Sequence, residues 1–210
     1  MSLPTIAPSG LYYPNNIVNI YMHAAAEVVG KDVFDGILRE CGLDRYIDNY
    51  PPNNFERKFD FSDFSMLNAG TAAIADEETY RAIGRASYAG GNRGFGALAG
   101  MGGVSMGFRL LPLNVRLKIG LTGMATIFSA FTDQHTEVTE HDDHFEYAIL
   151  KCPMCWGRTS DKPACGSAVG LLQEGLRSVM DDHEFEVEEI ACRAMGHDAC
   201  IFTIPKLEAS

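Results

Sequence analysis

The sequence contains no apolar run of about eighteen residues, the minimum for a helix that crosses a bilayer. Its first residues carry neither the basic segment nor the apolar stretch of a secretory signal. Positive charge is scarce, because 17 lysines and arginines stand against 28 acidic residues, which gives a formal net charge of −11. These absences exclude a membrane-spanning helix and argue against export. The acidic balance argues against binding to nucleic acid or to anionic membrane surfaces.

A chain that is not exported is expected to work in the cytoplasm, where thiols stay reduced and disulfides are rare. Catalytic patterns are missing as well. We identify no Ser-His-Asp order, no pair of catalytic carboxylates and no phosphate-binding loop. The sequence therefore indicates no catalytic residue, and it favours a role in binding over a role in catalysis.

Eight glycines lie between residues 90 and 107, in a pattern that resembles a dinucleotide-binding loop. That fingerprint requires a preceding strand within a βαβ unit, whereas a helix is predicted before these glycines. We therefore interpret the segment as a flexible loop or as closely packed backbone, and a mobile lid is a further alternative.

The apolar patterns predict one α+β domain over residues 1–210. A mainly helical part covers residues 1–132, and its expected helices are 17–30, 32–41, 62–74, 77–88 and 110–131. We expect Ser62 and Asp76 to cap two of these helices. In the part over residues 133–210, alternation predicts strands at 136–140, 145–150, 185–193 and 200–204, with a helix at 170–180. This order implies an antiparallel sheet of four to five strands with helices packed on one face.

Five of the six cysteines lie between residues 152 and 200, and this clustering is typical of a metal site. If the last hairpin turns about Gly196, Cys192 lies opposite Cys200, with Cβ atoms about 4.5–5.5 Å apart. Both thiolates could then bind one zinc ion, the metal that such spacing favours, at about 2.3 Å. Cys165 could complete the site from the preceding loop.

Two other interpretations of these cysteines remain open. The same hairpin geometry permits a cross-strand disulfide between Cys192 and Cys200, although a reducing cytoplasm disfavours it. The Cys152-Pro-Met-Cys155 segment has the spacing of a redox-active motif. Such motifs sit at a helix N-terminus, whereas this one follows a predicted strand and enters a loop.

A second group of potential metal ligands lies in the predicted turn between the first two strands. His141 and His144 flank two aspartates there and could bind a metal. Acidic turns of this kind are more often only solvated.

The segments 165–170 (CGSAVG) and 189–202 (EIACRAMGHDACIF) resemble the 4-vinyl reductase domain. That domain is named for a bacteriochlorophyll biosynthesis protein linked to 4-vinyl reduction. It is also similar to the sensory domains of phenol- and xylene-responsive transcription activators. The Cys152-Pro-Met-Cys155 motif resembles the stand-alone members of the family. The resemblance covers about fifty residues, and the helical first two-thirds of the chain match only in outline.

The resemblance implies an α+β ligand-binding fold shared with a Golgi-trafficking subunit, a homodimer, and an apolar pocket beside a structural zinc ion. The phenol sensors hold zinc with three cysteines and one glutamate. The matching residues here are Cys165, Glu189, Cys192 and Cys200. Strict alternation places Glu188 on the face of Cys192, so a role for Glu189 requires a β-bulge. In a regular strand, Cys152 or Cys155 becomes the better fourth ligand.

The leading functional hypothesis is a carrier or sensor that binds an apolar, aromatic or tetrapyrrole-like small molecule. Phe128, Phe131, Phe145 and Tyr147 are the candidate pocket residues, unless they pack as ordinary core. A second hypothesis is a reductase or accessory factor for a chlorophyll-type 4-vinyl group, but no flavin, nicotinamide or cluster site is recognisable. A third hypothesis is a dimeric adaptor protein without ligand chemistry.

Overall fold

The computed structural model describes residues 6–95 and 106–207. In the first half of the chain the elements are β1 (Tyr12–Pro14), α1 (Asn15–Val29), α2 (Lys31–Glu40), η1 (Asp44–Tyr46), β2 (Arg57–Asp60), α3 (Phe61–Ile74) and α4 (Glu77–Phe95). In the second half they are α5 (Met106–Arg109), α6 (Leu113–Phe131), β3 (Thr136–Glu140), β4 (His144–Ile149), α7 (Gly166–Val179), β5 (Glu188–Ala191), η2 (Arg193–Met195) and β6 (Cys200–Pro205).

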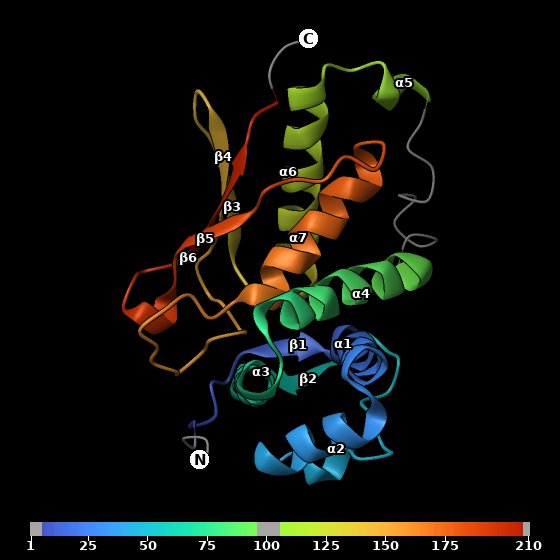
Figure 1. The fold of residues 1–210 in the computed structure, drawn as a ribbon, viewed down its shortest axis with the longest axis vertical. Coiled ribbons are helices and arrows are strands. Elements are labelled where there is room, and N and C mark those ends of the chain that lie inside the picture. Colours follow the sequence, from blue (N-terminus) through green and yellow to red (C-terminus); the bar gives the residue numbers. More distant parts are fainter. Residues whose placement is uncertain (1–5, 96–105, 208–210) are drawn as a thin grey trace.

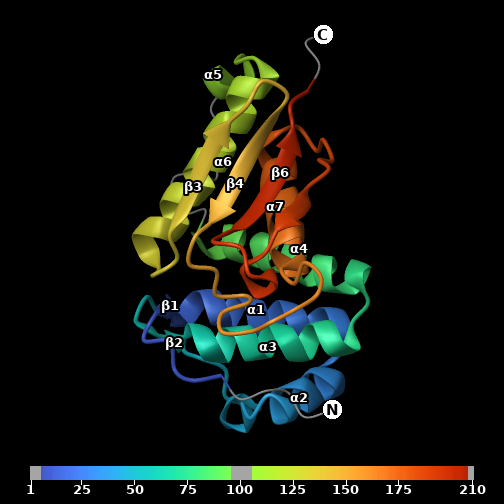
Figure 2. The ribbon, with the colours of Figure 1, turned by 90° about the vertical axis from the view of Figure 1, so that its left-hand side faces the viewer.

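The main sheet has four antiparallel strands in the order β3-β4-β6-β5, as the sequence predicted. Helices α6 and α7 cover one face of this sheet (Figure 1). Figure 2 shows the opposite face toward the viewer, with no described helix in front of it. Alternation along β4 sends Phe145, Tyr147 and Ile149 toward the helices, where they are buried.

The remaining helices form a second layer below the sheet, together with the short β1-β2 pair (Figure 2). Helix α4 joins the two parts, because it crosses α7 at very short range. A Cβ atom added at Gly84 would lie 1.9 Å from the backbone oxygen of Ser167, and one at Gly170 would lie 1.9 Å from that of Arg81. Only glycine therefore fits at this crossing.

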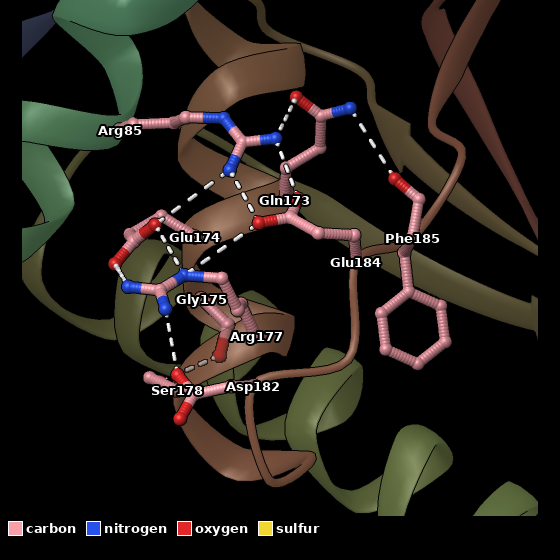
Figure 3. Close-up of polar contacts among 9 residues, drawn as sticks. All are labelled: Arg85, Gln173, Glu174, Gly175, Arg177, Ser178, Asp182, Glu184 and Phe185. Carbon is pink, nitrogen blue, oxygen red and sulfur yellow. Dashed lines mark hydrogen bonds and ion pairs between the residues drawn. The ribbon is translucent and has the colours of Figure 1, made fainter.

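A network of polar contacts links α4 and α7 to the segment that leads into β5 (Figure 3). Arg85 of α4 donates to Glu184 at 2.8 Å and to Gln173 at 3.1 Å. Gln173 in turn donates to the backbone oxygen of Phe185 at 3.2 Å. Arg177 pairs with Glu174 at 2.6 Å. Arg85 is thus the contact through which this network joins one helix to the other.

Replacing Arg85 with alanine is expected to lower the free energy of unfolding by about 1 kcal/mol, since partly exposed ion pairs contribute little individually. The loss should shrink at high salt. Arg81→Ala is the control, because its ion pair with Glu77 stays within α4. Chemical denaturation of both variants tests this expectation, and an equal loss in the two would contradict it.

Several helix boundaries differ from the sequence predictions. Asp60, not Ser62, caps α3, because its carboxylate accepts the Ser62 backbone N–H at 2.7 Å. Asp76 does cap the next helix, since it accepts the Thr79 N–H at 2.8 Å. That helix, α4, continues through Gly90 and Gly91 to Phe95, so the start of the glycine-rich segment is helical. Residues 96–105 of that segment lie outside the described residues.

The later elements also shift by a few residues. Helix α6 starts at Leu113 rather than at residue 110, because Pro112 takes an extended conformation before it. Helix α7 starts at Gly166, four positions before the predicted start. Strand β5 is shorter than predicted, and it is followed by the single turn η2. Among the described residues, no helix meets the length and hydropathy needed to cross a bilayer.

Candidate functional site

The five C-terminal cysteines converge on one buried point, although they come from four segments of the chain. Cys152 and Cys155 lie in the loop after β4, and Cys165 immediately precedes α7. Cys192 follows β5, and Cys200 begins β6. All five are buried and none forms a disulfide. The sixth, Cys41, lies apart and donates to the Met66 backbone oxygen at 3.1 Å.

The sulfur–sulfur distances in this cysteine cluster have the size of the edges of a metal tetrahedron. The Sγ atoms are 3.6 Å apart for Cys152 and Cys165, 3.4 Å for Cys155 and Cys200, and 3.7 Å for Cys165 and Cys200. A tetrahedral zinc ion with bonds of about 2.3 Å holds its sulfur ligands about 3.8 Å apart. A disulfide requires about 2.05 Å. The geometry is therefore that of separate thiolate ligands.

Glu189 joins the same cluster from β5. The register between β5 and β6 shifts between Glu189 and Ala191, which is the irregularity that the family resemblance required. As a result Glu189 is only 7% exposed, and its Oε2 accepts the Cys165 backbone N–H at 2.8 Å. Its other oxygen, Oε1, is buried without a hydrogen-bond partner. Burial raises the pKa of this carboxyl group.

Two overlapping ligand sets can be formed from these residues, and both include Cys165 and Cys200. The first adds Cys152 and Cys155, and the second adds Glu189 and Cys192. Ligand atoms within each set lie within 4.8 Å of one another. Cys192 Sγ lies 3.9 Å from Cys200 Sγ. Hydrogen bonds from Cys152 and the other cysteines lower the pKa of Cys155, which makes it the thiol most readily deprotonated.

An apolar cavity of about 250 Å³ lies beside this cluster, between α1, α4, α6, α7 and the sheet. Phe128, Phe131 and Tyr147 line it, as the aromatic pattern suggested. Phe145 is fully buried and is not among the lining residues. The other walls were not identified from sequence, and they come from all four helices: Ile17, Ile20, Tyr21, Ser87, Tyr88, Met124, Ile127, Ala168, Leu171 and Leu172 among others.

The polar atoms in the cavity wall are largely satisfied by the protein itself. Tyr13 hydrogen-bonds Gln134, and Ser87 donates to the Ile83 backbone oxygen at 2.7 Å. Tyr21 and Ser167 both donate to Asn68 Oδ1, at 3.1 and 2.9 Å. These groups therefore have little hydrogen-bonding capacity left for a ligand, and the surface that faces the cavity is mainly apolar.

The cavity and the cysteine cluster share part of their structure. Met154 lies between Cys152 and Cys155, and its side chain lines the cavity. Its sulfur accepts from Ser167 Oγ at 3.4 Å. Ala168, which also lines the cavity, stands three residues after Cys165 at the start of α7. Whatever fixes the cysteines thus also fixes one wall of the cavity.

Comparison with known proteins gives one family and one fold. Residues 145–206 match the family model of the 4-vinyl reductase domain, and this segment contains all five clustered cysteines. The match covers less than half of the chain, and it agrees with the resemblance found in the cysteine segments. No protein among the curated sequences matches the chain.

Solved structures with a similar fold are H-NOX proteins. An H-NOX protein from S. oneidensis in the Fe(II)NO ligation state is 11% identical, with a TM-score of 0.56 over 92% of this chain and 99% of its own. An oxygen-binding H-NOX domain related to soluble guanylate cyclases is 17% identical, with a TM-score of 0.53 over 91% and 92%. At these identities the likeness shows the α+β fold.

Proposed function

We propose that this protein binds an apolar small molecule in the cavity between α1, α4, α6 and α7, and acts as a sensor or carrier of it. The observation that carries the proposal is a cavity with aromatic and aliphatic walls whose polar atoms are already hydrogen-bonded. Ligand sites are typically concave and mostly apolar. The match to the 4-vinyl reductase domain and the H-NOX-like fold support a binding role.

The size of the cavity favours a ligand of one or two aromatic rings. An apolar cavity of about 150 Å³ is known to hold a benzene molecule, and this one measures about 250 Å³. Some of the H-NOX structures concern heme, as their titles state. Among the described residues that line the cavity there is no histidine or cysteine to bind a heme iron. A compact aromatic molecule therefore suits these walls better than a tetrapyrrole.

The proposal includes a structural zinc ion bound by the cysteine cluster. Cys152, Cys155, Cys165 and Cys200 are the ligands that the short sulfur–sulfur distances favour. Glu189 would then orient the site through the Cys165 backbone, with Cys192 as a neighbouring fifth thiol. A site closed by four protein ligands has no position for a water molecule, so the ion supplies rigidity rather than hydrolysis. It would hold Met154 and Ala168 in the cavity wall.

The homodimer is also a proposal, and exposed apolar side chains around the start of α6 support it. Leu110 is 83% exposed, and Leu113, Val115 and Ile119 are each at least 40% exposed. Clusters of this kind on a soluble protein often mark an interface. The reductase and adaptor hypotheses stay predictions.

Calorimetric titration with naphthalene tests the binding proposal. The protein is expected to bind about one equivalent in the micromolar range, because burying two rings releases several kcal/mol. Ala168→Phe should weaken binding at least about tenfold, because the added ring occupies the cavity. Gly91→Phe is a second variant, since Gly91 lines the cavity and a Cβ there meets nothing within 4 Å.

Ala73→Phe is the matched control, because it adds the same ring to an exposed position of α3. It should bind naphthalene as the unmodified protein does. The binding proposal is wrong if the folded protein shows no saturable uptake, or if the two cavity variants bind as tightly as the control. Parallel titration with hemin would reveal a preference for a tetrapyrrole.

A further inference from the structure

A second group of metal-ligating side chains lies at the β3–β4 turn, at the opposite end of β4 from the cysteine cluster. His141, His144 and Glu146 place one ligand atom each within 4.8 Å of one another. His141 Nε2 lies 3.4 Å from Glu146 Oε2, and His144 Nε2 lies 3.8 Å from Glu146 Oε1. The two imidazole rings are stacked, with centroids 4.4 Å apart and planes at 10°.

The hairpin itself brings these three side chains to one face. His141 and His144 flank a two-residue turn, and the His141 N–H donates to the His144 backbone oxygen at 2.9 Å. Residues opposed in this way across an antiparallel pair point to the same side. Glu146 is two positions after His144 on β4, so it shares that side as well. This is the face of the sheet that is turned toward the viewer in Figure 2.

The hydrogen bonds leave the Nε2 atoms turned toward Glu146. Asp143 accepts a hydrogen bond from His144 Nδ1 at 2.7 Å, which places the proton on Nδ1 and the lone pair on Nε2. Metal-binding histidines typically use a carboxylate in this way. His141 Nε2 is shielded from solvent and has no hydrogen-bond partner among the described residues. A metal ion would give this atom the partner that it lacks.

The nearby acidic groups are divided between two faces. Glu140, the last residue of β3, is bound by Lys118 at 2.8 Å and by Lys206 at 2.9 Å, toward the helices. Glu146 makes no ion pair with lysine or arginine in the described contacts, only the two with histidine. Its negative charge is therefore available to balance a cation between the two imidazoles.

We propose that His141, His144 and Glu146 form a second metal site, which binds a divalent first-row transition ion such as Zn²⁺. Zinc bonds to imidazole nitrogen and carboxylate oxygen are about 2.0–2.2 Å, so tetrahedral ligands lie about 3.4 Å apart. The observed distances of 3.4 and 3.8 Å approach that value, and a small tilt of the stacked rings completes it. Three protein ligands leave a position open, so the ion is exchangeable, unlike one enclosed by four cysteines.

The test is zinc titration of the full chain, followed by calorimetry and by native mass spectrometry that counts ions per chain. The unmodified protein is expected to take up one more zinc ion than His144→Gln or Glu146→Gln does. Asp143→Asn, which alters only the group that orients His144, should weaken this uptake about 10- to 100-fold. His135→Gln is the matched control, because its pairing with Glu137 at 3.2 Å is also a histidine–carboxylate contact of this sheet.

The control should take up as much zinc as the unmodified protein does. All four variants lie at partly or fully exposed positions, so circular dichroism should show an unchanged fold. The proposal is overturned if His144→Gln and Glu146→Gln bind the same number of zinc ions with the same affinity as the control. Because the comparison is between variants with an intact cysteine cluster, its result is independent of the cavity and of the cysteine site.

Discussion

Replacing Gly170 with alanine is expected to destabilise the protein by about 3 kcal/mol or more, the upper part of the range for overpacked positions. The new Cβ would lie 1.9 Å from the Arg81 backbone oxygen, so the backbones of α4 and α7 must separate. Both helices also line the cavity, and apolar ligand binding should weaken with them. Since domains are stable by about 5–15 kcal/mol, such a loss brings the fold near its limit.

Chemical denaturation measures this effect, and Gly123→Ala is the matched control. Gly123 lies within α6, and a Cβ there meets nothing within 4 Å. Alanine at that position should be neutral, or stabilising by up to about 1 kcal/mol, because it favours the helix. A Gly170→Ala protein as stable as Gly123→Ala would show that α4 and α7 do not cross in close contact.

Cys200→Ser is expected to remove about one equivalent of zinc and to destabilise the chain by an amount on the order of 5 kcal/mol, because the binding energy of a structural zinc ion is folding energy. Cys200 belongs to both candidate ligand sets, so its loss should abolish the site whichever set is used. Elemental analysis and thermal unfolding of the purified variant measure the two effects together.

Further serine variants then identify the ligands. If Cys152, Cys155, Cys165 and Cys200 bind the ion, Cys152→Ser should lose zinc, whereas Cys192→Ser should retain it. The reverse result would assign the site to Glu189 and Cys192. Cys41→Ser is the control, since Cys41 is a buried thiol outside the cluster. A Cys200→Ser protein with full zinc content and normal stability would contradict the metal site.

Much of the fold could be predicted because it depends on local patterns. Alternation along residues 136–149 indicates strands whatever they pair with, and the helical spacing of α1 is visible in the same way. The bulge beside Glu189 was predicted for a different reason. The position of this glutamate in the matching motif conflicts with a regular strand, and the register shift between Glu189 and Ala191 resolves that conflict.

The remaining features depend on contacts between distant segments, which no local pattern encodes. Gly84 and Gly170 are ordinary helix glycines in the sequence, and only the crossing of α4 with α7 explains them. The cavity takes walls from α1 and α4, far along the chain from the aromatics of α6. Phe145 and Tyr147 point to the same side of β4, yet only Tyr147 lines the cavity, because Phe145 lies two residues nearer the β3–β4 turn.

A crystal structure of the zinc-loaded protein with bromonaphthalene would test the account most directly, since anomalous scattering locates both elements. We predict a zinc peak among the sulfur atoms of the cysteine cluster, and a bromine peak among Phe128, Tyr147 and Leu172 in the cavity. Bromine found only on the molecular surface, with the cavity empty or filled by side chains, would contradict the proposed function.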